Sequence, residues 1–187
     1  MYVRRFLTAA AVLPTLALAG CGWAGEPEHV VHEAKTEGIY VDVGHLDYQV
    51  QISRQLNPSV APDKGYFAGL PDYVAPLTED QVWFGVSLRV QNQTDEPHES
   101  ADDFVIAETT GETFTPIDMD ADDNPLAYTA QEIGPKQVYP DPDELAGDSP
   151  TQGGMLLFKI PYSSLGNRPL EFRIEADGDE AVVDLDV

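Results

Sequence analysis

The alternation of apolar and polar residues between Val82 and Asn92 constrains the fold of this 187-residue chain more than any other feature. Apolar side chains occupy every second position of the stretch: Val82, Phe84, Val86, Leu88 and Val90. A helix would distribute them around its circumference, whereas a strand places them all on one face. The stretch therefore predicts a β-strand with its other face formed by Trp83, Gly85, Ser87, Arg89 and Gln91.

Two pairs of short apolar segments predict antiparallel hairpins. Residues 104–107 and 112–115 flank Thr110-Gly111, and residues 170–175 and 182–187 flank an Asp-Gly-Asp turn. Gly and Asp adopt the backbone conformations that tight turns need, so each pair can fold back on itself.

Two further segments complete the predicted strands. Leu46 to Ser53 alternates and predicts a half-buried strand, while Gly154 to Ile160 is apolar on both faces, which is typical of a central strand covered on two sides. About seven short strands without a convincing amphipathic helix predict an all-β fold. Seven antiparallel strands bury their apolar faces most simply as two packed sheets, so we expect a β-sandwich over residues 39–187.

Two long proline-rich connections, residues 57–80 and 116–153, join these strands. Long connections in a compact domain are functional loops or packed irregular segments. Their aromatic side chains either present a binding surface or hold the loops on the sandwich, and we favour packing: Tyr66, Phe67, Tyr73, Tyr128 and Tyr139.

Residues 1–20 have the three-part layout of a secretory signal. Positive charge at Arg4 and Arg5 precedes an apolar run from Phe6 to Leu18, and two small residues then lead to Cys21, the single cysteine. The run is shorter than the roughly 20 residues that a membrane-spanning helix needs. Leu18-Ala19-Gly20-Cys21 resembles the bacterial lipobox, which implies acyl chains on the Cys21 thiol and cleavage before it.

The lipobox resemblance implies a lipid-anchored protein at the cell membrane, facing the extracytoplasmic side. An ordinary cleaved signal with an incidental cysteine is the competing interpretation. A single acyl chain binds a membrane only marginally, and the diacylglyceryl group of mature lipoproteins, often with a further N-acyl chain, provides more than one. Arg4-Arg5-Phe6-Leu7 is similar to a twin-arginine signal but lacks a residue usually found inside it, so the export route stays open.

Residues 21–38 lack a sustained apolar period and predict a flexible tether. His29 and His32 lie three positions apart in it, and we expect both to be solvated because a metal site needs more ligands. A net charge of −23 excludes nucleic acid and anionic lipid headgroups as partners of the folded part. A lone cysteine excludes an internal disulfide.

The segment Trp83 to Pro97, followed by Asp103-Phe104 and by Gly111-Glu112-Thr113-Phe114, resembles the immunoglobulin-like domain of unknown function found in lipoproteins of actinobacteria and related bacteria. Residues 153–161 and 167–172 are similar to the late strands of that family. The resemblance implies an immunoglobulin-like sandwich and an extracytoplasmic setting. It implies no catalytic residues.

The densest acidic run, residues 118–124, suggests calcium as an alternative ligand. Calcium takes about six to eight oxygen ligands, and carboxylates at nearby loop positions can converge on one ion. The candidate ligands are Asp118, Asp120, Asp122 and Asp123. An EF-hand would need Gly where Asp123 stands and Glu where Thr129 stands, so that motif fails, and a solvated turn is the competing interpretation.

Nucleophilic catalysis needs a Ser or Cys beside an oriented base, and no motif of this kind surrounds His45 or His98. Either histidine would have to lie in a cleft with a serine and a carboxylate to support an enzyme. We therefore expect a non-catalytic module without a cofactor, anchored in the membrane by lipid, that binds an extracytoplasmic protein or a small ligand. A calcium-binding sandwich is the alternative.

Overall fold

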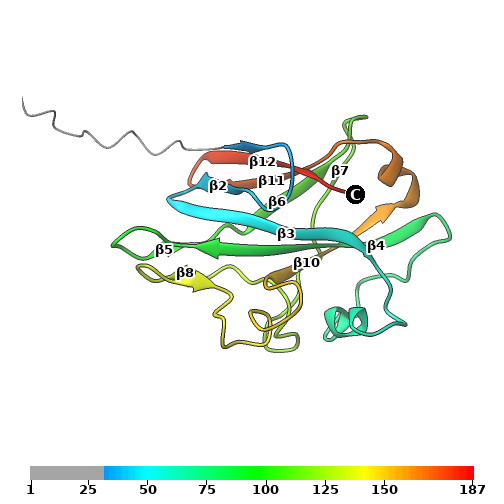
Figure 1. Cartoon of the computed structure of the whole chain (residues 1–187). Helices are drawn as coiled ribbons and strands as arrows, with labels where there is room; N and C mark the ends of the chain where they lie inside the picture. Colours follow the sequence, from blue (N-terminus) through cyan, green and yellow to red (C-terminus); the bar gives the residue numbers. More distant parts are fainter. Residues whose placement is uncertain (1–31) are drawn as a thin grey trace, which may run out of the picture.

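The computed structural model describes residues 32–187, which form two large β-sheets packed face to face and a separate two-stranded sheet (Figure 1). The first sheet has the strand order β1-β12-β11-β6-β7, and the second has the order β10-β4-β3-β2 with β9 also paired to β4. Every ladder is antiparallel except that between β1 and β12. The predicted all-β sandwich is thereby confirmed. The leader, Cys21 and His29 lie outside the described residues.

Seven of the twelve strands in the described part are four or more residues long. The first sheet consists of β1 (Glu33–Ala34), β12 (Asp179–Leu185), β11 (Leu170–Ala176), β6 (Asp103–Ala107) and β7 (Thr113–Phe114). The second consists of β10 (Gly154–Pro161), β4 (Gln81–Gln91), β3 (Leu46–Leu56), β2 (Tyr40–Val43) and β9 (Val138–Tyr139), while β5 (His98–Glu99) pairs with β8 (Glu132–Ile133). Two 3-10 helices, η1 (Asp63–Phe67) and η2 (Tyr162–Gly166), complete the elements, and no helix within residues 32–187 is long and apolar enough to cross a membrane.

The predicted hairpins and alternating strands are present, and their turns follow from residue type. β11 and β12 join through Asp177 and Gly178, which have φ values of 54° and 87°, the left-handed conformation that such turns need. β2 falls outside the predicted strands and joins β3 through Gly44 and His45, at φ values of 56° and 70°. A Cβ on Gly44 would lie 2.9 Å from the Cβ of Ala176, so this close approach requires glycine.

The inner core lies between the two sheets. Phe84 and Phe158, cross-strand partners on β4 and β10, are fully buried, and Phe158 packs edge-to-face on Phe172 of β11 with ring centroids 6.4 Å apart. Phe172 also stacks on Phe104 of β6 at 5.7 Å. Burying one such side chain contributes roughly 1.5–3 kcal/mol. These rings therefore couple four strands of the two sheets.

An outer core covers the opposite face of β4 and β10. Trp83 on this face is only 6% exposed because the connections 57–80 and 116–153 fold over it. The buried members of the outer core are Leu56, Tyr66, Trp83, Met119, Ala127, Met155 and Leu157. Of the five aromatic side chains predicted to hold these loops, Tyr73 alone is largely exposed. Both connections are therefore packed irregular segments.

The position of β10 corrects the expectation of a central strand. Both of its faces are covered, but in the sheet order it stands at the edge, beside β4. The backbone of the 116–153 connection bonds to its free edge: the Ile117 N–H donates to the Leu157 carbonyl at 2.7 Å, and the Tyr128 N–H to the Met155 carbonyl at 3.0 Å. The connection thus satisfies this edge as a neighbouring strand would.

The last residues of the predicted tether belong to the sandwich. β1 pairs with β12, and the side chain of Ala34 is buried. The Glu37 carboxylate accepts hydrogen bonds from the backbone N–H groups of Ser53 at 3.1 Å and Asp186 at 3.0 Å. The boundary at residue 38 is therefore corrected, since the domain begins no later than Glu33. Apolar periodicity could not reveal this segment because its strand, β1, has only two residues, and polar residues flank the buried Ala34.

Candidate functional site

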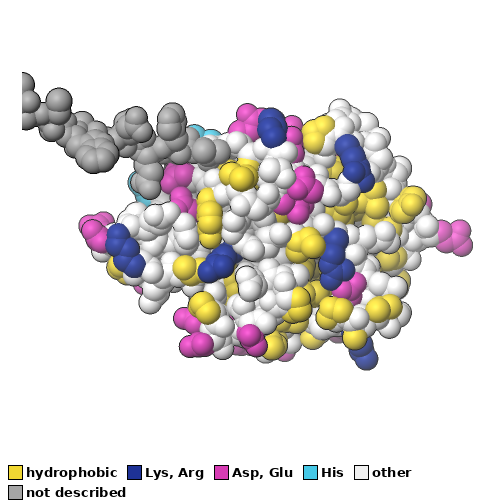
Figure 2. Space-filling view, viewed as in Figure 1, with side chains coloured by type: hydrophobic (Ala, Val, Ile, Leu, Met, Phe, Trp, Pro, Cys, Tyr) yellow, Lys and Arg dark blue, Asp and Glu magenta, His cyan; other side chains and the backbone are white. Residues whose placement is uncertain are grey.

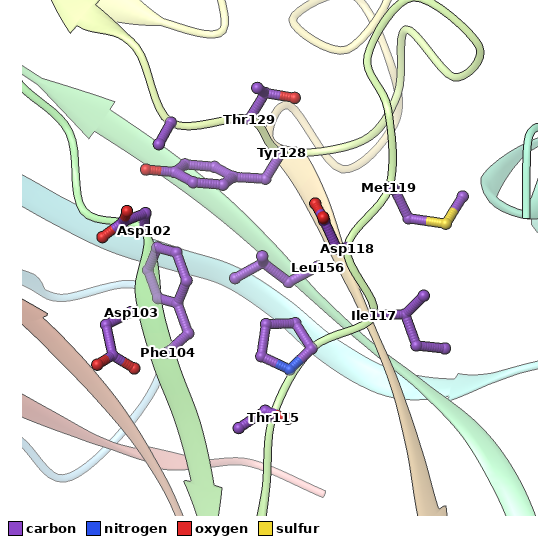
Figure 3. Close-up of a pocket in the computed structure, with 12 residues that line it drawn as sticks. Asp102, Asp103, Phe104, Thr115, Ile117, Asp118, Met119, Tyr128, Thr129 and Leu156 are labelled. Atoms are coloured by element: carbon purple, nitrogen blue, oxygen red, sulfur yellow. The ribbon is translucent and has the colours of Figure 1, made fainter. Parts of the chain in front are cut away.

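A cleft of about 410 Å³ lies between the start of β6, the middle of β10 and the 116–153 connection (Figure 3). Its floor is apolar and consists of Phe104, Ile117, Met119, Tyr128 and Leu156. The polar residues of its lining are Asp102, Asp103, Thr115, Asp118 and Thr129. Volume and lining match those of small-ligand sites, which are largely apolar with a few placed polar groups.

Fold elements of both cores supply the floor. Phe104 and Leu156 belong to the inner core, because strand alternation on β6 and β10 turns them toward each other's sheet. Met119 belongs to the outer core. Phe104 packs edge-to-face on Tyr128 with ring centroids 5.1 Å apart, which fixes both rings. The cleft therefore opens where the inner and outer cores meet.

Two tyrosines hold the wall that carries Asp102 and Asp103. The Ala101 N–H donates to the Tyr48 hydroxyl at 2.7 Å, and the Tyr128 hydroxyl donates to the Ala101 carbonyl at 2.8 Å. Burial raises the pKa of the Tyr48 hydroxyl to about 12. Burial also raises the pKa of Tyr128, with Tyr48 and Asp102 acting in the same direction. Both phenols are therefore protonated at neutral pH, and Tyr128 can keep its donor role.

A third tyrosine fixes the opposite wall. The Tyr139 hydroxyl donates to the Ala127 carbonyl at 3.2 Å and accepts from the Thr129 N–H at 3.1 Å. Its ring packs edge-to-face on Tyr128 at 5.4 Å. The chain from Ala127 to Thr129 is thereby tied to β9, and its geometry does not depend on a regular element of its own.

Asp102 and Asp103 also border a second hollow, beside the β11–β12 turn. The remaining acidic side chains of that hollow are Glu175, Asp177, Asp179 and Glu180. One mouth of the cleft is therefore flanked by a strongly negative surface. On the face seen in Figure 2, by contrast, acidic side chains are interspersed with Lys and Arg.

The four aspartates predicted as calcium ligands are divided by the structure. Asp118 lines the cleft, whereas Asp120 accepts a hydrogen bond from the Asp122 N–H at 2.9 Å and shapes a turn. Asp123 lies against Gly69, whose Cβ position would be 2.5 Å from the Asp123 Cβ. Within residues 32–187, no three His, Cys, Asp or Glu side chains are placed to hold a metal ion. Calcium binding at this loop stays a prediction.

The three histidines of the described part, His32, His45 and His98, do not line the cleft. His45 and His98 contact each other with ring centroids 4.9 Å apart, and His32 Nδ1 lies 3.0 Å from the Asp42 carbonyl. In the described part of the chain, no hydrogen bond joins His45 or His98 to a serine or a carboxylate. The arrangement that would support a catalytic histidine is thus missing there.

Sequence reasoning identified Asp118 but not the cleft around it. Tyr128 is recognisable as a loop aromatic, and Phe104 and Leu156 as strand residues, but no local pattern shows that they meet. Asp102 and Asp103 stand in an acidic run that resembles other acidic runs in the chain. Their convergence depends on contacts between segments more than ten residues apart.

Comparison of the sequence with protein-family models gives no match, and comparison with curated proteins gives none either. Solved structures with a similar fold include the yjhA protein from Bacillus subtilis, at 8% identity and a TM-score of 0.46, with 81% of this chain and 99% of that chain covered.

A second similar structure is an uncharacterized β-sandwich protein from Clostridium difficile, at 14% identity and a TM-score of 0.42, covering 85% of this chain and 99% of that one. A third is the candidate lipoprotein ycdA from Bacillus subtilis, at 12% identity and a TM-score of 0.45, covering 78% of this chain and 38% of the other. The structures similar to this chain thus include a β-sandwich protein and a candidate lipoprotein.

Proposed function

We propose that this protein is a lipid-anchored, extracytoplasmic module that binds a small ligand in the cleft between β6, β10 and the 116–153 connection, without catalysis. The observation that carries the proposal is the cleft itself, with its buried apolar floor and exposed polar rim. The leader and Cys21 support the extracytoplasmic setting, as does the resemblance of residues 83–97 to immunoglobulin-like domains of bacterial lipoproteins.

The sheet order supports an accessible cleft on an anchored domain. The chain from Cys21 enters the first sheet through β1, at one edge. β6 and β7 form the other edge of the same sheet, where the cleft lies. Three strand positions therefore separate the entry of the anchored segment from β6, so the attachment need not cover the ligand site.

The cleft lining supports binding over catalysis. It contains no Ser, Cys, His, Lys or Arg among the described residues, and the Tyr128 hydroxyl already donates to a backbone carbonyl. Thr115 and Thr129 supply hydroxyls, and no described histidine, lysine or cysteine lines the cleft beside them. The polar groups present are suited to orienting a ligand.

Binding at the cleft is tested with phenethyl alcohol, a neutral aromatic probe, titrated into the mature protein while NMR follows the amides of residues 128–130. We expect a dissociation constant of roughly 1–10 mM, as a ligand of this size allows. Thr115→Trp should fill the cleft and abolish the shifts. Thr109→Trp places the same side chain at an exposed position outside the lining and should leave them unchanged. Saturable shifts that persist in Thr115→Trp, or their absence from the unmodified protein, would contradict the proposal.

The anchor is tested separately with Cys21→Ser, expressed in a bacterium that processes lipoproteins. We expect loss of fatty-acid labelling, with the protein released into the medium or left unprocessed. Gly22→Ser is the matched control and should be labelled and retained. If Cys21→Ser stays at the membrane at its mature mass, the anchor is attached elsewhere and this part of the proposal is wrong.

A further inference from the structure

We propose that the ligand of the cleft is a small organic cation, with an ammonium or guanidinium group on an apolar body. The inference rests on the proposed binding function and adds the chemical class of ligand. It follows from three acidic residues that line a cleft with an apolar floor, and from the volume of the cleft, about 410 Å³, which suits a small molecule.

The floor selects for an apolar body. Phe104, Tyr128 and Leu156 are each less than 7% exposed, so the surface that they retain is directed largely into the cleft. The edge-to-face contact between the two rings holds them in place before any ligand arrives. A ligand that covers this surface gains roughly 25 cal/mol for each Å² of apolar area removed from water.

The rim selects for positive charge. Asp102 and Asp103 border the cleft at the start of β6, with their carboxylates directed to the side away from Phe104 and Leu156, and Asp118 lies across the cleft on the connection (Figure 3). Within residues 32–187, no protein donor forms a hydrogen bond or ion pair with any of these three carboxylates, so no protein group neutralises them. A cation in the cleft would form a charge-assisted hydrogen bond with Asp118, about twice as strong as a neutral one, while Asp102 and Asp103 add negative potential along the wall.

The surroundings oppose an anionic ligand. No Lys, Arg or His lines the cleft, and the adjoining hollow adds four more carboxylates along the wall of Asp102 and Asp103. The net charge of −23 extends this negative potential over the molecule and raises the local concentration of cations. These carboxylates would therefore repel an anion, and no basic side chain in the cleft lining would offset the cost of its desolvation.

The test compares three probes of one shape, phenethylamine, phenethyl alcohol and phenylacetate, by calorimetric and NMR titration of the mature protein at pH 7 and low salt. We expect the amine to bind about tenfold or more tightly than the alcohol and phenylacetate to bind least. Raising the salt concentration to about 0.5 M should weaken the binding of the amine but not that of the alcohol, because salt screens interactions between charges and the alcohol is neutral.

Asp118→Asn should weaken the amine at least about fivefold without changing the alcohol, since the amide keeps the shape and removes the charge. Asp122→Asn removes the same charge from the same loop but outside the cleft lining, and it should have no effect. If Asp122→Asn weakens the amine as much as Asp118→Asn, the attraction is general and the ligand class is wrong. If the alcohol binds at the cleft and the amine binds no better, the ligand class is wrong while the binding function stands. If neither probe binds, both proposals fall.

Discussion

The inner and outer cores share the strands β4 and β10 but are built in different ways. In the inner core, regular strands of two sheets face each other, and Phe84, Phe158 and Phe172 are wholly buried. In the outer core, two long connections with only the short helix η1 as a regular element cover the other face, and Trp83 and Met119 retain a few per cent of exposure. One strand can thus contribute alternate side chains to two cores, because its successive residues point to opposite faces.

The difference shows how stability and site are divided in this molecule. The inner core fixes the two sheets and also includes Tyr128 and Tyr139 of the 116–153 connection, while the outer core packs Met119 and Ala127 of the same connection, which forms one wall of the cleft. Loops held by few contacts open more readily than strands that pair along their length. We therefore expect the outer core to respond to mutation locally and the inner core to respond as a whole.

The largest effect is expected for Phe172→Ala in the inner core. Removing a fully buried ring that contacts Phe104 and Phe158 should lower the free energy of unfolding by about 3–5 kcal/mol. Urea unfolding of the variant measures this loss. Tyr73→Ala removes an exposed ring from a loop and should change the free energy of unfolding by less than about 0.5 kcal/mol. Similar losses in the two variants would contradict the role given to the inner core.

A smaller and more local effect is expected for Leu157→Ala in the outer core. The loss should be about 2–4 kcal/mol, since Leu157 is 1% exposed but faces a layer of loops that can partly collapse into the space. Hydrogen exchange should accelerate between residues 117 and 127 before it does in β11 and β12. Leu145→Ala, at an exposed leucine of the same connection, is the control. Equal acceleration in all three segments would show that the two cores unfold together.

The ion pair that holds η1 on the outer face should contribute less. The Arg54 guanidinium donates to both carboxylate oxygens of Asp63, which is 7% exposed and also accepts from the Asn57 N–H at 2.9 Å. We expect Asp63→Asn to cost about 1–2 kcal/mol, less than a buried pair would, because Arg54 is partly exposed. Asp72→Asn, at an exposed acid of the same connection, should cost nothing measurable.

The contribution of Asp63 should depend on pH. The hydrogen bond from Arg54 holds the pKa of the Asp63 carboxyl below its ordinary value, and the Asn57 N–H acts in the same direction. The pKa of an aspartate in the unfolded chain is near 3.9, and the pKa of Asp63 in the folded protein is lower. The stability that Asp63 contributes is therefore fully present above about pH 4 and is lost as the pH falls through the folded-state pKa. Urea titrations of wild type and Asp63→Asn should therefore converge in acid, and a constant difference down to about pH 2 would contradict the assignment.

The smallest effect is expected where the N-terminal segment meets the sandwich. Glu37→Gln should cost about 0.5–1.5 kcal/mol, because the Glu37 carboxylate accepts from the backbone of Ser53 and Asp186. Glu33→Gln removes only an exposed ion pair with Lys35 and should cost nothing measurable. Thermal unfolding of the two variants makes the comparison. A larger loss of stability in Glu33→Gln than in Glu37→Gln would show that the N-terminal segment is held on the sandwich mainly by β1 and not by Glu37.

Period-two alternation at Val82 to Asn92, and its repetition along the chain, determined by itself that this protein is an all-β sandwich with closing hairpins. Alternation is a local property, since it records which side chains leave water on one face of one strand. The turns could also be predicted locally, because the backbone preferences of glycine and aspartate are properties of the single residue.

Tertiary structure alone decided the burial of Trp83, the place of β10 at a sheet edge, the docking of Glu37 and the meeting of Asp102, Asp103 and Asp118 around one cleft. Each of these depends on two segments far apart in sequence, and one of the two is irregular and carries no period. Contact between such segments is set by the packing of the whole chain, so no single stretch of residues encodes it.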